Sequence, residues 1–386
     1  MSLWFAGSAI APQLSARWGL TGTEIGWLTA AVQLGFVVGT ACSALLNLAD
    51  VVPARVLFSA AALLGAIANA WLAVAPDYGS AFLSRFLSGA CLAGVYPPAM
   101  KMAATWFRER RGLAVGTIVG ALTIGKAGPY LVTALPGASV AFITLLASSS
   151  AVVAALLIFF GYRDGPFAFE SRPFAWSRIA EVVRNSRWRL VTGSYLGHMT
   201  ELYSYWTWIP YFVAATVARD THALTASSSP LVALLSFGVI AVGGAGCIWG
   251  GLVADRIGRA PLVRRALVIS ASCCALVGLT FGRSLWIVAP LALLWGFFII
   301  ADSAQFSVLV TESVPAHAVG TALTLQVSLG FLLTTGAIQV IPLVVRSAGW
   351  PWAFAILAIG PLIGVVLIRR LQLQLNSEAR PSIATS

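Results

Sequence analysis

Ionisable side chains within apolar stretches of this chain give the first indication of its chemistry. His198 and Glu201 are three residues apart and Tyr205 is one turn further, so on a helix they share one face. Glu201 can carry a proton there, and His198 either takes part in the same chemistry or is a hydrogen-bonded histidine of the interior. The candidates from this stretch for binding or proton coupling are His198, Glu201, Tyr205 and Trp206.

Lys126 and Arg85 are basic residues inside other apolar stretches. A charge at the centre of a bilayer costs at least ~2.5–3.5 kcal/mol, so Lys126 should face a cavity and bind a ligand or form a structural ion pair. Lys126 and Glu201 have similar expected depth in opposite halves, so they can form a pair. We expect an anionic substrate to displace Glu201 from Lys126. Arg85 needs a buried partner or extends its guanidinium to the membrane surface.

Three further polar residues are weaker candidates. Gln33 and Gln326 could reach a cavity, although intramembrane glutamines often only bond helix to helix. Asp302 either belongs to a cytoplasmic gate or caps a local helix break.

Metal, cofactor and enzyme chemistry find no support in the sequence. The five cysteines lie in apolar stretches without CxxC spacing, and there are only three histidines. We find no nucleophile with a base and no ATP-binding signature. We therefore expect no enzyme activity, no cofactor and no metal.

The composition indicates a membrane protein. Hydrophobic residues make up 59% of the 386 residues and charged residues only 10%, whereas soluble domains have roughly 45–50% and 25%. The net charge of +11 could suggest nucleic acid, but the arginines lie in short connections and form no basic arm. This distribution fits the positive-inside rule better.

Apolar runs of the ~20 residues that cross a bilayer recur along the chain. The expected spans are residues 23–48, 56–75, 78–106, 113–135, 140–162, 190–217, 231–254, 262–281, 285–310, 319–345 and 350–368. A partial span covers residues 1–14, which is too short to cross. We expect about 15 further residues upstream of Met1; a cleaved signal peptide is the alternative, but the stretch has no basic n-region.

Two short motifs recur about 205 residues apart. Ala114-Val115-Gly116-Thr117 returns as Ala318-Val319-Gly320-Thr321, and Leu48-Ala49-Asp50 returns as Val253-Ala254-Asp255. The repeat predicts two similar helical halves, which is the architecture of a secondary transporter.

The predicted organisation follows from these spans and from the arginine-rich connections. It comprises a first half (residues 1–162), a cytoplasmic linker (163–189), a second half (190–371) and a disordered tail (372–386). The linker's amphipathic segment 176–188 lies along the membrane surface or is a plain solvated connector with a short helix. With arginines inside, both ends of a complete chain face the cytoplasm.

The run Gly251-Leu252-Val253-Ala254-Asp255-Arg256-Ile257-Gly258-Arg259 closely resembles the GxLADRxGR signature of the major facilitator superfamily. In the first half Asp50 remains, but Arg55 is displaced and the following glycine is missing. The resemblance implies a charge cluster that gates the cytoplasmic side. The candidates for this gate are Asp50, Arg55, Gly251, Asp255, Arg256, Gly258, Arg259 and Asp302.

Two more runs are similar to superfamily patterns. Arg85 and Gly89 match RxxxG, whose arginine is linked to proton coupling in several members, and Tyr96-Pro97-Pro98 indicates a proline-broken helix. Gly128-Pro129 matches only part of the antiporter signature, which weakens a drug-antiporter interpretation.

The resemblance implies an all-α membrane protein with the twelve-helix superfamily fold and a truncated first helix. We expect a monomeric secondary transporter in the inner membrane, coupled to protons and moving a small anion or carboxylate. Within the superfamily, the resemblance favours the nitrate/nitrite and organic-anion porters. The alternative is proton-driven efflux of hydrophobic cations or drugs.

Overall fold

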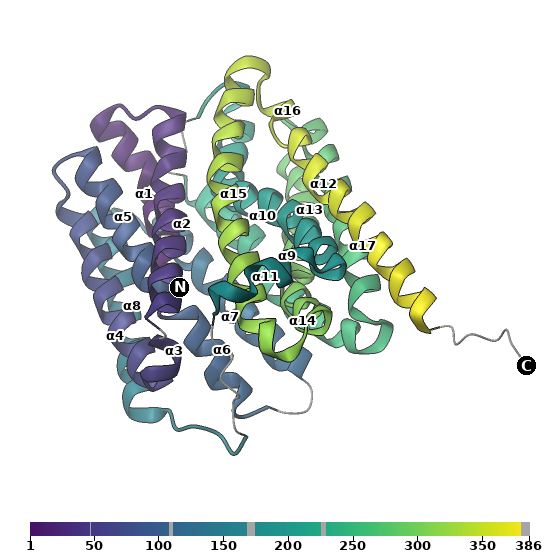
Figure 1. Ribbon diagram of the computed structural model, residues 1–386. Helices are drawn as coiled ribbons and strands as arrows, with labels where there is room; N and C mark the ends of the chain where they lie inside the picture. The colour runs from purple at the N-terminus through teal and green to yellow at the C-terminus, as the bar shows by residue number, and fades with distance from the viewer. Residues whose placement is uncertain (47, 108–110, 168–173, 225–228, 380–386) are drawn as a thin grey trace, which may run out of the picture.

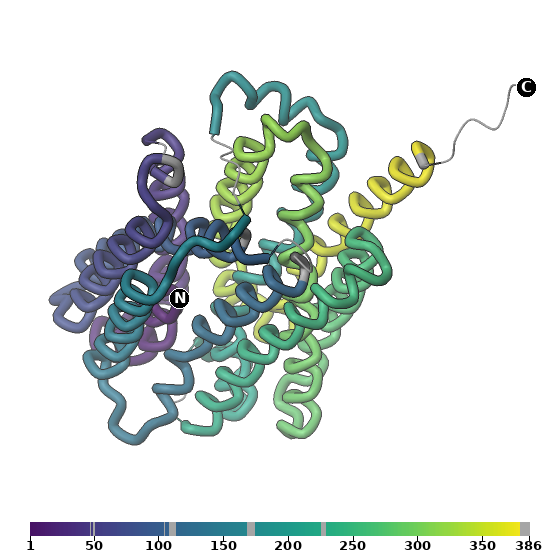
Figure 2. Tube along the Cα trace, turned by 90° about the horizontal axis from the view of Figure 1, so that it is seen from below, coloured from purple at the N-terminus to yellow at the C-terminus, as the bar shows by residue number. Residues whose placement is uncertain are grey.

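The protein forms two helical bundles that lie side by side (Figure 1). The computed structural model describes the whole chain except residues 47, 108–110, 168–173, 225–228 and 380–386. In the described part, all regular secondary structure is helical. Figure 2 shows the two bundles from below, with the first half in purple and blue and the second in green and yellow.

The helices of the first half follow the predicted spans. They are α1 (Ser2–Trp18), α2 (Gly22–Leu45), α3 (Leu48–Val51), α4 (Ala54–Trp71) with η1 (Leu72–Val74), α5 (Tyr78–Leu92), α6 (Tyr96–Ala104), α7 (Arg111–Thr133) and α8 (Val140–Gly161).

The second half begins with a short connecting helix and repeats the pattern. Its elements are η2 (Trp176–Arg178), α9 (Ile179–Arg184), α10 (Ser186–Ala218), α11 (Pro230–Ile257), α12 (Arg259–Val277), η3 (Gly278–Thr280), α13 (Leu285–Ala301), α14 (Ser303–Ser313), η4 (Ala316–Ala318), α15 (Val319–Ala348), α16 (Trp350–Ala353), η5 (Ala355–Ala358) and α17 (Ile359–Ala379).

Among the described residues, nine helical segments are long and apolar enough to cross a membrane. The other three predicted spans are α1, the pair α5 and α6, and α10. The pair is divided by a break, and α10 carries many polar side chains along its 33 residues. The chain is therefore a multi-pass membrane protein.

Two spans are broken at corresponding places in the repeat. In the first half α5 ends at Leu92 and α6 begins at Tyr96, with proline in its first turn as the sequence indicates. In the second half, Asp302 separates α13 from α14. Such breaks expose backbone groups and are tolerated where the helix is surrounded by protein.

The halves meet along two helix pairs, α2 with α15 and α7 with α11. Small residues allow α7 and α11 to approach closely, since a Cβ atom on Gly120 would lie only 2.8 Å from the carbonyl oxygen of Gly244. Between α2 and α15, the Gln339 amide bonds to the backbone of Thr23 and Trp27 at 3.2 and 3.1 Å. Gly22 at the start of α2 faces Pro342 of α15.

The predicted linker is divided between the two halves. Its first part is bound to the end of α6, because Thr105 accepts backbone hydrogen bonds from Gly165 and Phe167 at 3.0 Å each. Its second part is bound to the second half, where the Ala175 N–H donates to Thr321 (2.9 Å) and the Asn185 amide donates to the Ser313 carbonyl (2.9 Å).

Side chains reinforce this second attachment. Glu181 of α9 contacts His317 of η4 at 3.0 Å, and Arg178 donates to the His317 carbonyl. Of the two alternatives for this segment, the structure has the connector with a short helix, and this helix is docked on the second half.

The expected disordered tail is wrong for residues 372–379. The helix α17 continues to Ala379, and Glu378 pairs with Arg187 while Gln374 donates to Ser186 at 3.3 Å. Leucines at 373 and 375 and helix-favouring polar residues let the helix extend beyond its apolar part. Residues 380–386 lie outside the described part.

Candidate functional site

Lys126 lies between the two halves, surrounded by aromatic rings. Its side chain is 3% exposed, and its Nζ atom donates to the Tyr203 hydroxyl at 2.9 Å. The same Nζ lies 4.4 Å from the ring centre of Trp206, 4.7 Å from that of Trp4 and 4.9 Å from that of Tyr203. These cation–π contacts partly replace the water that burial removes.

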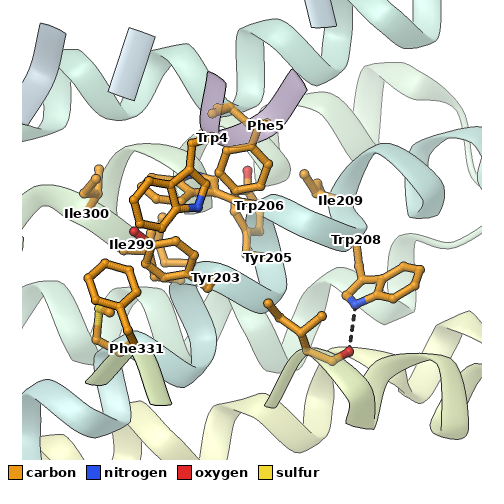
Figure 3. Close-up of a cluster of buried hydrophobic side chains, with 14 of the residues drawn as sticks. Trp4, Phe5, Tyr203, Tyr205, Trp206, Trp208, Ile209, Ile299, Ile300 and Phe331 are labelled. Atoms are coloured by element: carbon orange, nitrogen blue, oxygen red, sulfur yellow. Dashed lines mark hydrogen bonds between the residues drawn. The ribbon is translucent and has the colours of Figure 1, made fainter. Parts of the chain in front are cut away.

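The central aromatic cluster consists of Trp4, Phe5, Phe36, Tyr203, Trp206 and Phe331. Phe331 of α15 contacts Trp4 of α1 and Phe36 of α2, with ring centres 5.3 and 4.7 Å apart. Figure 3 shows the rings of Trp4, Tyr203 and Phe331 gathered between helices of both halves. The cluster thus joins the halves at the level of Lys126.

The polar side chains expected near this centre are buried. Gln33 accepts from Thr334 at 2.8 Å, which links α2 to α15, and its amide nitrogen has no hydrogen-bond partner. Neither polar atom of the Gln326 side chain has a partner. Unpaired polar groups in such a place are costly and commonly serve a ligand or bound water.

Glu201 lies in the interior of the second half. Its Oε1 accepts hydrogen bonds from Ser270 and Trp295, both at 2.6 Å, while its Oε2 has no partner. The carboxyl group is fully buried. A buried acid with one free oxygen can take up and release a proton there.

His198 lies one turn before Glu201 and contacts Asp302 at the break between α13 and α14. The distance between His198 Nδ1 and Asp302 Oδ1 is 3.1 Å, and both side chains are 1% exposed. His198 Nε2 and Asp302 Oδ2 have no partner. His198 and Asp302 therefore connect α10 to the break between α13 and α14 inside the second half.

The assignment of Asp302 to the cytoplasmic gate stays a prediction. Its carboxylate is enclosed in the second half, and Asp302 marks the local helix break that was the alternative.

The expected contact between Lys126 and Glu201 is also absent among the described residues. At 100° per residue, Glu201 and Tyr203 lie about 160° apart around α10. The Tyr203 face of α10 meets Lys126, whereas the Glu201 face points toward α12 and α13. One helix therefore presents a binding face to the first half and an acidic face to its own half.

Tyr205 does not face the binding site. Its hydroxyl group bonds to the carbonyl oxygens of Val239 and Ala292 at 3.2 and 3.0 Å, and its ring packs on Trp295. Tyr205 shares the Glu201 face, so it connects α10 to α11 and α13. Trp206, by contrast, lies against Lys126.

Arg85 does not extend to the membrane surface. Its guanidinium group is fully buried and donates to the carbonyls of Leu3 (2.8 Å) and Trp4 and to Asn69 (3.1 Å). These bonds hold the first turns of α1 on α5. Because Trp4 belongs to the central aromatic cluster, Arg85 positions one wall of the site.

The gate motif adopts the expected turn without the expected ion pair. Gly258 has φ 89° between α11 and α12, a conformation that favours glycine, and Gly251 is buried in α11. Asp255 and Arg256 are exposed, and no ion pair joins Asp255 to another described residue. Arg259 instead pairs with Glu312 of α14 at 2.7 Å.

The first-half copy of the motif gives less information. Arg55 is exposed at the start of α4, and the side chain of Asp50 lies outside the described residues. The gate residues therefore remain a prediction.

Four residues of the site were not among the predicted ones: Trp4, Tyr203, Ser270 and Trp295. Tyr203 and Trp206 could have been recognised by their three-residue spacing, which places both on the opposite face of α10 from Glu201. The contacts of Trp4 and Trp295 depend on helices far away in the sequence, so no local pattern reveals them.

Two pseudo-symmetric helical halves with ionisable groups buried in and between them are the architecture of a membrane transporter. A family profile described as the Major Facilitator Superfamily matches residues 1–338. The chain therefore belongs to the major facilitator superfamily.

Comparison with solved structures supports this fold. A crystal structure of the E. coli fucose:proton symporter superposes with a TM-score of 0.68 at 12% sequence identity, covering 96% of each chain. No curated protein sequence matches the chain.

Proposed function

We propose that this transporter moves a small organic anion across the inner membrane together with protons, with Lys126 as the anion site. One observation carries the proposal. Lys126 is a buried basic side chain between the halves, and no carboxylate of the described chain pairs with it. An incoming carboxylate would supply the missing charge.

Proton coupling is assigned to Glu201, with the His198–Asp302 pair beside it. These groups are buried, they have unpaired polar atoms, and they lie on the side of α10 that faces away from Lys126. In this proposal the anion binds at one face of α10 and the proton is carried on the opposite face. Rotation or tilting of α10 would therefore couple the anion site to the proton site. The similar fold of a fucose:proton symporter is compatible with such coupling.

One observation favours the alternative, efflux of a hydrophobic cation. Three aromatic rings surround the Lys126 ammonium group, and such cages also bind organic cations. A cation could enter only if the lysine left the cage or lost its proton.

The test uses purified protein in liposomes that contain a pH-sensitive dye. Acetate, benzoate, nitrate, citrate, fucose and tetraphenylphosphonium are added in turn, and proton movement is recorded for wild type and Lys126→Ala. We expect at least one anion to drive proton movement that Lys126→Ala abolishes. Proton movement driven only by tetraphenylphosphonium, or an anion response unchanged in Lys126→Ala, would overturn the proposal.

A further inference from the structure

The surroundings of Lys126 restrict which anion fits. Within the central aromatic cluster, rings come from α1, α2, α10 and α15, so both halves contribute. The ring centres of neighbouring members are 4.7–5.9 Å apart, and the pairs are tilted or edge-on. These are the arrangements that aromatic rings prefer.

Polar groups are few beside these rings. The described residues offer the Lys126 ammonium group, the Tyr203 hydroxyl, the unpaired indole N–H of Trp4 and the amide of Gln33. A sugar or a tricarboxylate would bury several hydroxyl or carboxylate groups here, and each one without a partner would cost free energy. A substrate with a single anionic group and an apolar body avoids this cost.

The contacts between the halves indicate which kind of apolar group the substrate carries. Phe331 of the second half packs against Trp4 and Phe36 of the first. When the halves separate, these ring contacts open and leave aromatic faces on both sides. A flat ring that enters between them would restore contacts of the same kind, so the halves could close over it.

We infer that the site accepts an aromatic monocarboxylate, whose carboxylate binds Lys126 and whose ring lies among Trp4, Trp206 and Phe331. This inference rests on the proposed function and narrows its substrate class. It also assigns a role to the cluster, which recognises the body of the substrate while Lys126 recognises its charge.

The test compares probes that differ in one property. Binding to the purified protein is measured by tryptophan fluorescence and by thermal stabilisation, with phenylacetate, cyclohexylacetate, 2-phenylethanol, acetate and citrate. Phenylacetate should bind roughly threefold to tenfold more tightly than cyclohexylacetate, because it adds ring–ring contacts to a similar apolar area. It should bind about tenfold to hundredfold more tightly than 2-phenylethanol, which lacks the charge.

Two variants connect this preference to the cluster. Phe331→Leu should abolish the preference for phenylacetate over cyclohexylacetate while binding of the latter persists, and Phe36→Leu should weaken it. The matched control is Phe160→Leu, which replaces a phenylalanine that is 78% exposed on α8. Each variant is first compared with wild type by gel filtration and melting temperature.

The outcomes separate this inference from the proposed function. Lys126-dependent binding of acetate or citrate with no advantage for phenylacetate would reject the aromatic preference and leave anion transport standing. An unchanged preference in both Phe331→Leu and Phe36→Leu would reject the assigned site. Binding of 2-phenylethanol as tight as that of phenylacetate would reject the carboxylate, and with it the anion.

Discussion

Lys126 of α7 contacts one face of α10 through Tyr203, whereas Glu201 lies on the opposite face of α10, and this separation determines how their substitutions should combine. Lys126 contacts the rings of Trp4 and Trp206, whereas Glu201 bonds to Ser270 and Trp295. If the two residues were a structural ion pair, neutralising both would restore function. Because they do not touch, we expect no such recovery.

The first prediction concerns Lys126→Ala, Glu201→Gln and the double variant. Lys126→Ala should abolish anion binding at every pH, because it removes the attracting charge. Glu201→Gln should keep binding and exchange but lose accumulation driven by a pH gradient. The double variant should lack both activities; uptake into proteoliposomes with and without a pH gradient measures this. Recovery of uptake in the double variant would contradict the separation of the two sites.

The second prediction separates a structural tyrosine from a binding one. Tyr205→Phe removes a hydroxyl that bonds to the carbonyls of Val239 and Ala292, so it should lower stability by about 1–3 kcal/mol without changing substrate affinity. Tyr203→Phe should instead weaken binding, because Tyr203 contacts Lys126. Thermal unfolding and ligand titration of both variants provide the comparison; weaker binding by Tyr205→Phe alone would reverse the assignment.

At the scale of single residues, the apolar runs predicted which ionisable side chains lie inside helices but not which way these side chains face. Lys126, Glu201 and His198 are buried within long helices, whereas their depth in a membrane stays a prediction from run length and helix rise. The apolar runs did not predict that Tyr205 faces its own half or that Arg85 binds the backbone of α1. The rotation of each helix depends on packing against distant helices, and a single sequence does not reveal it.

The helical elements follow the sequence closely where apolar runs and turn signals coincide. Prolines indicated the break before α6, whereas the matching break at Asp302 has no proline and was only one of two interpretations. The end of α17 was misjudged because a polar composition does not distinguish a surface helix from a disordered tail.

Capping provides the third prediction, at the scale of one helix. Asp77 caps α5, and its bond from the Ser80 N–H at 2.7 Å lowers the pKa of this exposed carboxyl below its usual 3.8. A lowered folded-state pKa stabilises the protein above the unfolded pKa, and this contribution is lost as pH falls through the folded value. Asp77→Ala should therefore lower the melting temperature at pH 7.

The pH dependence is the check on this cap. The difference in melting temperature between wild type and Asp77→Ala should shrink as pH decreases below 3.8. A difference that stays constant across this range would mean that the carboxylate bond does not cause it. Asp77→Asn, which keeps an oxygen acceptor, serves as the matched variant.

At the scale of the whole molecule, the two halves must part and close during transport. Gly22 of α2 and Pro342 of α15 face each other at the ends of these helices opposite the linker, and a Cβ atom on Gly22 would lie 2.9 Å from that of Pro342. Disulfides need Cβ atoms about 3.5–4.5 Å apart, so a small shift would bring two cysteines into range.

The fourth prediction follows from this contact. The double variant Gly22→Cys with Pro342→Cys should form a disulfide on mild oxidation and stop transport, and reduction should restore it. Each single variant, oxidised in the same way, controls for the five native cysteines. Full transport by the oxidised and demonstrably crosslinked protein would show that these ends do not separate in the cycle.

The divided linker sets a mechanical limit on the same motion. Phe167 is hydrogen-bonded to the first half and Ala175 to the second, and these two residues are eight positions apart in the sequence. At no more than about 3.6 Å per residue, these two attachment points can lie at most about 29 Å apart. The linker-side ends of the halves can therefore separate only within this distance, unless one of the two hydrogen-bonded attachments breaks.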